Sequence, residues 1–123
     1  MGKKILVVDD MDNTLEMLKE GLTPEGYDVE TINNATQGLE MIKTDAYDVV
    51  LLDIQMPDMT GLDIISAIKD TPLIRTTKII LMTASDLPSE DLTNLMKVGV
   101  VAWVRKPIRI EILLGRLKTL FKN

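Results

Sequence analysis

Three aspartates crowd the end of an apolar run near the start of the chain. The stretch "ILVVDDMDNT" places Asp9, Asp10 and Asp12 directly after four aliphatic residues. Carboxylates this close repel one another, so the arrangement is unfavourable unless a cation or a reaction uses it. Such a group can hold a divalent cation, or one of its members can act as a nucleophile. The stretch alone leaves both kinds of chemistry open.

Three more reactive side chains stand where other apolar runs end. Asp53 and Thr83 close two of these runs, and Lys106 follows a third. Together with Asp9 and Asp10 they would supply three carboxylates, one hydroxyl and one ammonium. The carboxylates carry −3 and the ammonium returns +1, so a divalent cation would neutralise the remainder. An all-oxygen ligand set suits Mg²⁺, with Mn²⁺ as a substitute.

This set of groups favours phosphoryl transfer to an aspartate. Such a transfer needs in-line positioning and neutralisation of the charge on the phosphoryl oxygens. Mg²⁺ and Lys106 can supply that charge, and the Thr83 hydroxyl can donate a hydrogen bond. Without metal, repulsion between the carboxylates should raise the pKa of at least one of them.

Short apolar runs that alternate with segments of helical period would bring these residues together. Four of the five runs are almost continuous Val, Ile and Leu, which is typical of strands buried on both faces. This alternation predicts an α/β fold, a doubly wound parallel sheet with helices on both faces and ligands bound at the carboxyl edge. The runs span residues 4–9, 27–32, 48–53, 78–83 and 100–104, and the helical stripes include Leu15, Leu18, Leu22, Leu39, Ile42, Ile64, Ile65, Ile68, Leu92, Leu95, Met96, Ile110, Leu113, Leu114 and Leu117.

Length and composition limit the range of functions. With 123 residues the chain should form one domain. The absence of Cys and His excludes disulfides, thiolate nucleophiles, the usual zinc sites and histidine chemistry on this chain. A net charge of −5 argues against direct binding to nucleic acid. With no run of membrane-spanning length and no signal-peptide pattern, we expect a cytoplasmic protein without membrane contact.

The opening stretch fits two families that phosphorylate an aspartate. "DMDNT" resembles the DxDx[TV] signature of haloacid-dehalogenase-type phosphohydrolases, which implies Asp10 as nucleophile and Asp12 as general acid. The alternative is the response regulator receiver domain, in which Asp9 and Asp10 form a metal pocket and Asp53 accepts the phosphoryl group. The hydrolase pattern needs a further acidic pair after its lysine, but the C-terminal segment holds only one acid. The hydrolase interpretation also leaves Asp53 without a role, so the receiver interpretation is favoured.

The resemblance to receiver domains, including those of chemotaxis regulators, covers essentially the whole chain. "VVDD", "LLDIQMPDMTG", "LMTAS" and "WVRKP" occur in the order of that family, each at the end of a predicted strand. The resemblance implies a flavodoxin-like, five-stranded parallel sheet in the order 2-1-3-4-5. It also implies a single receiver domain over residues 1–123, acting in two-component signalling.

The resemblance further implies how metal and phosphate are bound. Asp10, Asp53 and the backbone carbonyl of Gln55 would hold Mg²⁺, with Asp9 acting through water. Asp53 would take its phosphoryl group from the phosphohistidine of a sensor kinase or phosphotransfer protein. Gln55 and Ser85 would set the lifetime of the phosphate by controlling the access of water.

The same family pattern assigns the residues that would contact the phosphoryl oxygens. These are Lys106 and Thr83, helped by the backbone amides near Met56 and Ala84. The peptide bond between Lys106 and Pro107 should be cis, a conformation that proline makes accessible.

The resemblance also implies a switch. Phosphorylation would draw Thr83 inward, and Trp103 in the fifth strand would follow into the vacated space. The changed surface would consist of the fourth predicted helix, the fifth strand and the fifth predicted helix, where a downstream protein or a second copy binds. Such a domain catalyses only its own phosphorylation and dephosphorylation. Because no DNA-binding module follows the last predicted helix, we expect a stand-alone receiver, with excision from a longer regulator as the alternative.

Several residues have simpler explanations. We predict that Asp12 is the N-cap of the first helix, where a short acid accepts a backbone N–H. The side chain of Met56 should serve packing. Gly61 should allow a turn conformation that is closed to residues with a Cβ. The apolar run "VGVVAW" (98–103) favours a buried strand over an apolar interface.

Overall fold

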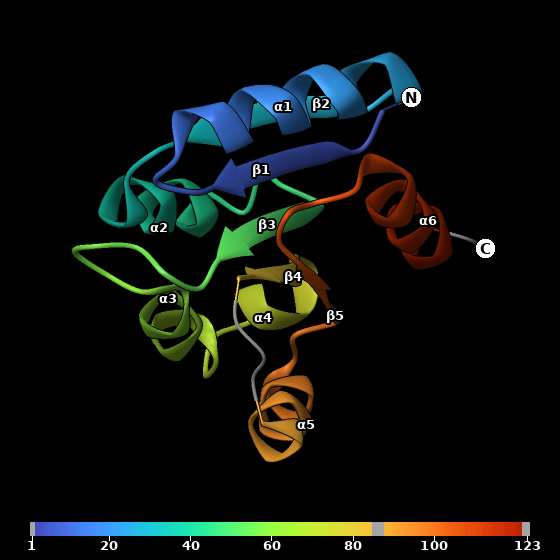
Figure 1. The fold of residues 1–123 in the computed structure, drawn as a ribbon. Coiled ribbons are helices and arrows are strands. Elements are labelled where there is room, and N and C mark those ends of the chain that lie inside the picture. The colour runs from blue at the N-terminus through green and yellow to red at the C-terminus, as the bar shows by residue number, and fades with distance from the viewer. Residues whose placement is uncertain (1, 85–87, 122–123) are drawn as a thin grey trace.

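The computed structural model describes residues 2–84 and 88–121. Strands and helices alternate along the chain, as the apolar runs predict (Figure 1). The elements are β1 (Lys4–Val8), α1 (Asp12–Leu22), a 3₁₀ turn η1 (Thr23–Glu25), β2 (Asp28–Ile32), α2 (Ala35–Lys43), β3 (Val49–Asp53), α3 (Gly61–Ile68), α4 (Leu73–Thr76), β4 (Lys78–Thr83), α5 (Ser89–Val98), β5 (Ala102–Arg105) and α6 (Ile110–Leu120).

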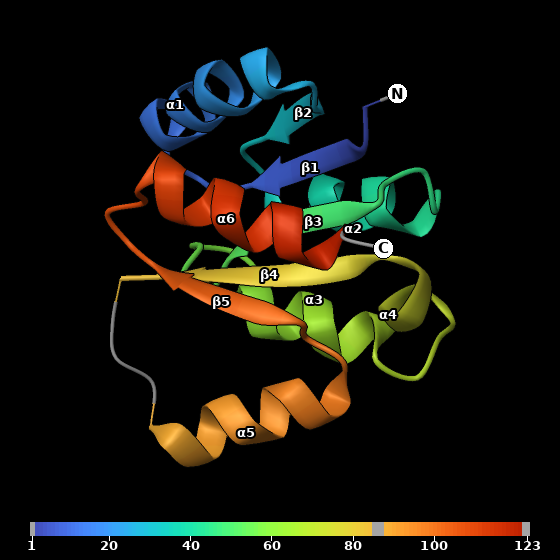
Figure 2. The ribbon, with the colours of Figure 1, turned by 90° about the vertical axis from the view of Figure 1, so that its right-hand side faces the viewer.

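The five strands form one parallel sheet in the order β2-β1-β3-β4-β5, which confirms the predicted topology. Successive side chains of a strand point to opposite faces, so each central strand contributes to two cores. In β1, Leu6 and Val8 face the core covered by α2 and α3, whereas Ile5 and Val7 face the core covered by α1 and α6. Figure 2 shows α6 lying across one face of the sheet and α3 behind the other. Burial on both faces explains why these strands are almost wholly aliphatic.

One short helix, α4, is absent from the sequence-based prediction. It begins directly after Pro72, a residue that suits the start of a helix, and contains only four residues. That length is too short to show a helical period of apolar residues. The helices predicted as fourth and fifth are therefore α5 and α6 of the structure. The fifth strand also begins later than predicted, at Ala102 rather than at residue 100.

Helix α5 covers the sheet more loosely than the other long helices. None of its ten residues is buried, and only Leu95 and Val98 pack partly against the core. Met96, which the sequence places in the apolar stripe, is 46% exposed. Trp103 on the neighbouring β5 is also exposed, so the prediction that this run forms a buried strand holds for Val100 but not for Trp103. The sheet is thus least covered beside α5.

The prediction that Asp12 caps α1 is wrong. The N-cap position is Met11, whose backbone N–H donates to Asp9 Oδ1 over 2.9 Å. This hydrogen bond turns the chain one residue earlier, so Asp12 becomes the first residue inside the helix. There its carboxylate still lies at the favourable end of the helix dipole, and it accepts a hydrogen bond from Asn33 at 3.0 Å.

The explanation predicted for Gly61 is also wrong. Its φ is not positive; only Gly26 and Gly99 among the described glycines have a positive φ. A Cβ on Gly61 would instead lie 2.4 Å from the backbone carbonyl oxygen of Asp53. Glycine is needed because the start of α3 packs directly against the end of β3.

We expect Gly61→Ala to lower the free energy of unfolding by about 1–3 kcal/mol, because the backbone must shift to admit the methyl group. Urea denaturation measures the change. The matched control is Gly115→Ala within α6, where a Cβ would meet no described atom within 4 Å. This control should be neutral or gain up to ~1 kcal/mol, since alanine favours helix. Equal stability of the two variants would contradict the close contact at Gly61.

Candidate functional site

The polar residues singled out in the sequence meet at the carboxyl edge of the sheet. Asp9 directly follows β1, Asp53 and Thr83 are the last residues of β3 and β4, and Lys106 directly follows β5. The strand arrowheads in Figure 2 point toward this edge. Parallel pairing of β1 with β3, β3 with β4, and β4 with β5 brings these strand ends together.

Three carboxylates form a compact cluster here. One oxygen each from Asp9, Asp10 and Asp53 lies within 4.8 Å of the others. Asp9 and Asp53 are buried, at 0% and 3% exposure, whereas Asp10 is exposed. Such all-oxygen donors, with one side open to solvent, fit Mg²⁺, which prefers carboxylates and retains several waters. These residues could therefore hold a magnesium ion.

Lys106 bridges two of these acids. Its Nζ lies 2.6 Å from Asp9 Oδ2 and 3.2 Å from Asp53 Oδ2. Its backbone N–H donates to the carbonyl oxygen of Thr83 over 2.7 Å, and the Lys106–Pro107 peptide is cis, as predicted. Burial would lower the pKa of the ammonium, but the hydrogen bond to Asp9 and the charges of both acids outweigh burial and raise it. Lys106 is therefore a firmly positioned cation.

The pKa of Asp53 is raised from 3.8 to about 6. Burial is the larger cause, and repulsion from Asp9 adds to it; Lys106 and the backbone N–H of Gln55 act in the opposite direction. That N–H donates to Asp53 Oδ1 over 3.2 Å. The prediction of a raised carboxyl pKa is confirmed, although burial contributes more than the repulsion from which it was argued.

This pKa predicts how pH acts on the metal-free protein. The pKa of Asp53 in the folded state, about 6, exceeds its ordinary value of 3.8, so the protonated carboxyl favours folding. This contribution to the free energy of unfolding is fully present below pH 3.8, and it is lost as the pH rises through about 6. Compared with Asp53→Asn, the wild type should lose on the order of 1–2 kcal/mol of unfolding free energy between about pH 4 and pH 7. Urea denaturation of both proteins in EDTA measures this difference, and a pH-independent difference would count against the raised pKa.

The loop between β3 and α3 is fixed at both ends. At its start, the backbone N–H of Ile54 donates to a carbonyl of β4, and the Gly61 N–H closes the loop onto Ile54 over 2.9 Å. At its end, Thr60 and Asp63 form a reciprocal capping box at the N-terminus of α3. The side chain of Met56 is buried in the core, as expected for a packing residue. The loop therefore holds the backbone beside Asp53 in place.

The two residues expected to form the switch occupy different environments. Thr83 is buried at 2% exposure, whereas Trp103 on β5 is 36% exposed and lies at the surface. Strands β4 and β5 are paired in parallel. Thr83 lies opposite Arg105, which is two residues beyond Trp103 along β5. Ala84 directly follows β4. Ser85 lies outside the described residues.

Residues 5–118 match the response regulator receiver domain. The chain belongs to this family. The receiver is 34% identical over 120 residues to the response regulator PleD of Caulobacter vibrioides, covering 98% of this chain and 26% of PleD. It is 34% identical over 123 residues to the response regulator MprA of Mycobacterium tuberculosis, covering 100% of this chain and 52% of MprA. The chain thus spans about a quarter of the length of PleD and about half of the length of MprA.

Solved receiver structures share its fold. The chemotaxis protein CheY4 of Vibrio cholerae is 29% identical, with a TM-score of 0.85 over 98% of this chain and 100% of that one. The BeF3-activated receiver domain of DrrB is 33% identical, with a TM-score of 0.83 and complete coverage of both chains.

Family membership establishes the general role of the receiver. It is a signalling domain of two-component systems rather than a conventional enzyme. Members of the family are generally phosphorylated, bind Mg²⁺, and interact with histidine kinases and downstream targets. The phosphohydrolase alternative is not favoured by these comparisons. None of the helices formed by the described residues has the length and apolarity needed to cross a lipid bilayer.

Proposed function

We propose that residues 1–123 form one receiver domain that accepts a phosphoryl group on Asp53 from a histidine kinase or phosphotransfer protein in a Mg²⁺-dependent reaction. One observation carries this proposal: Lys106 contacts Asp53 beside a cluster of three carboxylates within 4.8 Å of one another. The buried Asp53 is thus surrounded by groups that bind a cation and neutralise an anion.

The contacts of Asp9 distinguish its role from that of Asp10. Asp9 Oδ1 accepts a hydrogen bond from the Met11 N–H and Asp9 Oδ2 accepts one from Lys106 Nζ, so both oxygens of Asp9 are engaged. Both oxygens of Asp53 are likewise engaged, by the Gln55 N–H and by Lys106, so these contacts set the exposed Asp10 apart from the other two acids. We propose that Asp9 acts on the metal through water. Asp10, which is exposed, and Asp53 would bind Mg²⁺ directly, together with the backbone carbonyl of Gln55.

The chemical step needs an ionised acceptor. With a metal-free pKa of about 6, Asp53 is mostly ionised at neutral pH. One of its oxygens forms a bond to phosphorus while the P–N bond of the donor phosphohistidine breaks, and the imidazole leaves with the electron pair. Bound Mg²⁺ would supply positive charge for the phosphoryl oxygens. Lys106 and the Thr83 hydroxyl, with the backbone amides of Met56 and Ala84, would bind the same oxygens.

The phosphorylated site would then act on a binding surface. Thr83 would move toward the phosphoryl group, and the exposed Trp103 would turn inward beside it. This would change the face formed by α5, β5 and α6, where a downstream protein or a second copy of the chain binds. The loose packing of α5 supports its role as the element that moves. We propose no direct contact with nucleic acid or membrane.

Treatment of the purified protein with acetyl phosphate tests this function. In the presence of Mg²⁺ we expect one phosphoryl group per chain, which peptide mapping by mass spectrometry places on Asp53. EDTA should prevent the labelling, because the phosphoryl group is then repelled by the carboxylates. Labelling of Asp10 instead would overturn the proposal.

A further inference from the structure

A surface cavity of about 390 Å³ lies between β5 and α6. The consecutive residues from Trp103 to Pro107 line one side of it, and α6 with its N-cap lines the other. Among the described residues of this lining none is acidic and four are cationic, in a chain whose net charge is −5: Arg105, Lys106, Arg109 and Arg116. We infer that the cavity binds an acidic segment of a partner protein that inserts a large apolar side chain.

The apolar part of the cavity consists of side chains that the fold leaves in contact with water. Trp103 is 36% exposed and Ile112 is 50% exposed. Neither belongs to the residues that build the two cores, so packing within the chain does not explain their size. An apolar side chain placed between them would remove both from water, which is favourable. Tryptophan and arginine are also the residue types that contribute most often to the binding energy of protein interfaces.

Two arginines of the cavity lie on the same side of α6 as Ile112. Arg109, Ile112 and Arg116 are three and four positions apart, which places them on one face of the helix. Arg109 is the N-cap of α6, where the helix dipole disfavours a cation and where its side chain makes no capping hydrogen bond. Both arginines are exposed, and neither forms an ion pair with another described residue. Carboxylates on either side of an inserted apolar side chain would each meet one of these arginines.

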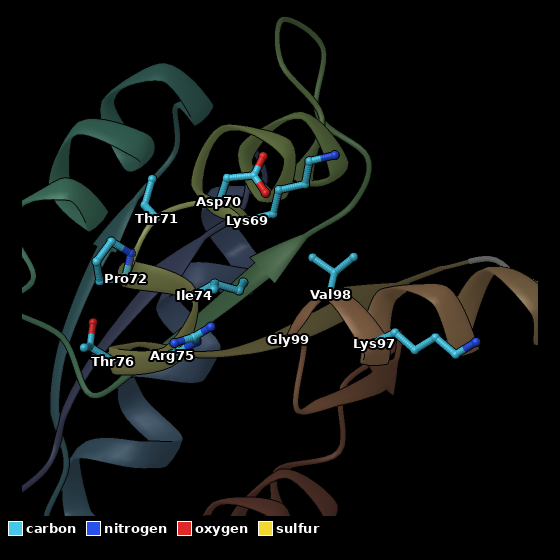
Figure 3. Close-up of a pocket in the computed structure, with 10 residues that line it drawn as sticks. All are labelled: Lys69, Asp70, Thr71, Pro72, Ile74, Arg75, Thr76, Lys97, Val98 and Gly99. Carbon is cyan, nitrogen blue, oxygen red and sulfur yellow. The ribbon is translucent and has the colours of Figure 1, made fainter.

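A larger cavity between α3, α4 and α5, of about 720 Å³, does not offer this combination. Figure 3 shows that the charged ends of Arg75 and Lys97 point apart there. An acid, Asp70, also lines it, and its lining includes none of the large exposed apolar side chains of the described residues. Of these two cavities, the one beside β5 therefore has the lining expected for an acidic segment with an apolar anchor.

Binding in the cavity should depend on the position of Trp103, a step that rests on the proposed function. The cavity is present with Trp103 at the surface, where this side chain forms part of its wall. Phosphorylation of Asp53 would turn Trp103 inward and withdraw that part of the wall. The acidic segment should therefore bind the form with Trp103 at the surface and be released by phosphorylation. By linkage, the bound segment should weaken the binding of a phosphoryl mimic by the same factor.

Titration with a capped peptide that carries a Leu–Phe pair between glutamates tests the cavity, in EDTA at low salt. Trp103 is the only tryptophan of the chain, so its fluorescence should change saturably on binding. Ile112→Ser should raise the Kd about tenfold through lost apolar contact, and Arg116→Gln about threefold through one lost exposed charge interaction. Lys118→Gln, an exposed lysine of α6 outside the cavity, should leave the Kd unchanged.

Four results would overturn the inference. The first is the absence of a saturable change in fluorescence. The second is an equal affinity for the peptide with lysines in place of the glutamates, and the third is an equal affinity when serines replace the Leu–Phe pair. The fourth is a dimer of the protein alone in sedimentation that Ile112→Ser abolishes, which would assign the cavity to a second copy of the chain.

Beryllofluoride with Mg²⁺, a mimic of the phosphoryl group, tests the release. It should raise the Kd of the peptide about fivefold or more in the wild type and leave it unchanged in Asp53→Asn. An unchanged or lower Kd in wild-type protein that acetyl phosphate labels would contradict the release. The two proposals can fail separately. A peptide that does not bind in EDTA contradicts the inference whatever the labelling of Asp53, whereas binding without any labelling contradicts the proposed function.

Discussion

Asp53→Asn protein should accept no phosphoryl group from acetyl phosphate in the presence of Mg²⁺, a loss of at least ~100-fold relative to the wild type. An amide oxygen is a poor nucleophile and carries no charge for the metal or for Lys106, which lies 3.2 Å from the carboxylate. The fold should persist, because asparagine is nearly isosteric and removes a buried charge whose pKa is already raised. Mass spectrometry of the intact protein measures the loss, and the unfolding midpoint verifies that the variant is folded.

Asp12→Asn provides a matched control for that experiment. Asp12 belongs to the same aspartate-rich stretch, but its carboxylate contacts Asn33 outside the cluster of Asp9, Asp10 and Asp53. Labelling of Asp12→Asn should therefore equal that of the wild type. Retained labelling of Asp53→Asn, or loss of labelling in Asp12→Asn, would favour chemistry through the opening stretch and contradict the assignment of Asp53.

The carboxyl edge of the sheet could be predicted from sequence because buried parallel strands are nearly pure aliphatic runs. A polar residue at the end of such a run, such as Asp53 after Val49–Leu52, marks both the strand end and the site. The parallel topology then brings together residues as distant in sequence as Asp9 and Lys106. The local sequence pattern and the sheet topology were therefore sufficient to predict which residues meet at the carboxyl edge.

Features set by tertiary contacts were not predictable in this way. The position of Asp12 depends on the hydrogen bond between Asp9 and Met11, and the need for Gly61 depends on the approach of α3 to β3. Neither contact leaves a local sequence pattern. The raised pKa of Asp53 likewise depends mainly on burial, which the spacing of acids does not reveal.

One missed feature did carry a sequence signal. "TGLD", from Thr60 to Asp63, matches the pattern of a capping box in which an acid follows a hydroxyl residue by three positions. The structure forms this box at the start of α3. It would have placed the helix start, and with it the end of the loop beside Asp53, from sequence alone.

Lys106→Ala should lower the unfolding free energy of the metal-free protein by about 3 kcal/mol, because it leaves a buried acid pair without its cation. Asp9 is fully buried, and Lys106 is its partner at 2.6 Å. Lys106 holds the pKa of Asp53 down, so without this cation the pKa of Asp53 should rise further, and protonation will recover part of the loss at low pH. Urea denaturation in EDTA at neutral and acidic pH measures both effects.

Measurements on Lys106→Ala in the presence of Mg²⁺ should distinguish the structural role of Lys106 from its role in phosphoryl transfer. If the acid cluster binds Mg²⁺, the ion should stabilise Lys106→Ala more than the wild type, because it replaces the missing positive charge beside Asp9 and Asp53. Labelling by acetyl phosphate should nevertheless remain reduced by about 10-fold or more, since the ammonium no longer binds a phosphoryl oxygen. Lys118→Ala, an exposed lysine on α6, should change neither quantity. Unchanged stability of Lys106→Ala in EDTA would contradict an ion pair between Lys106 and the two buried acids, which would remove the electrostatic basis of the site.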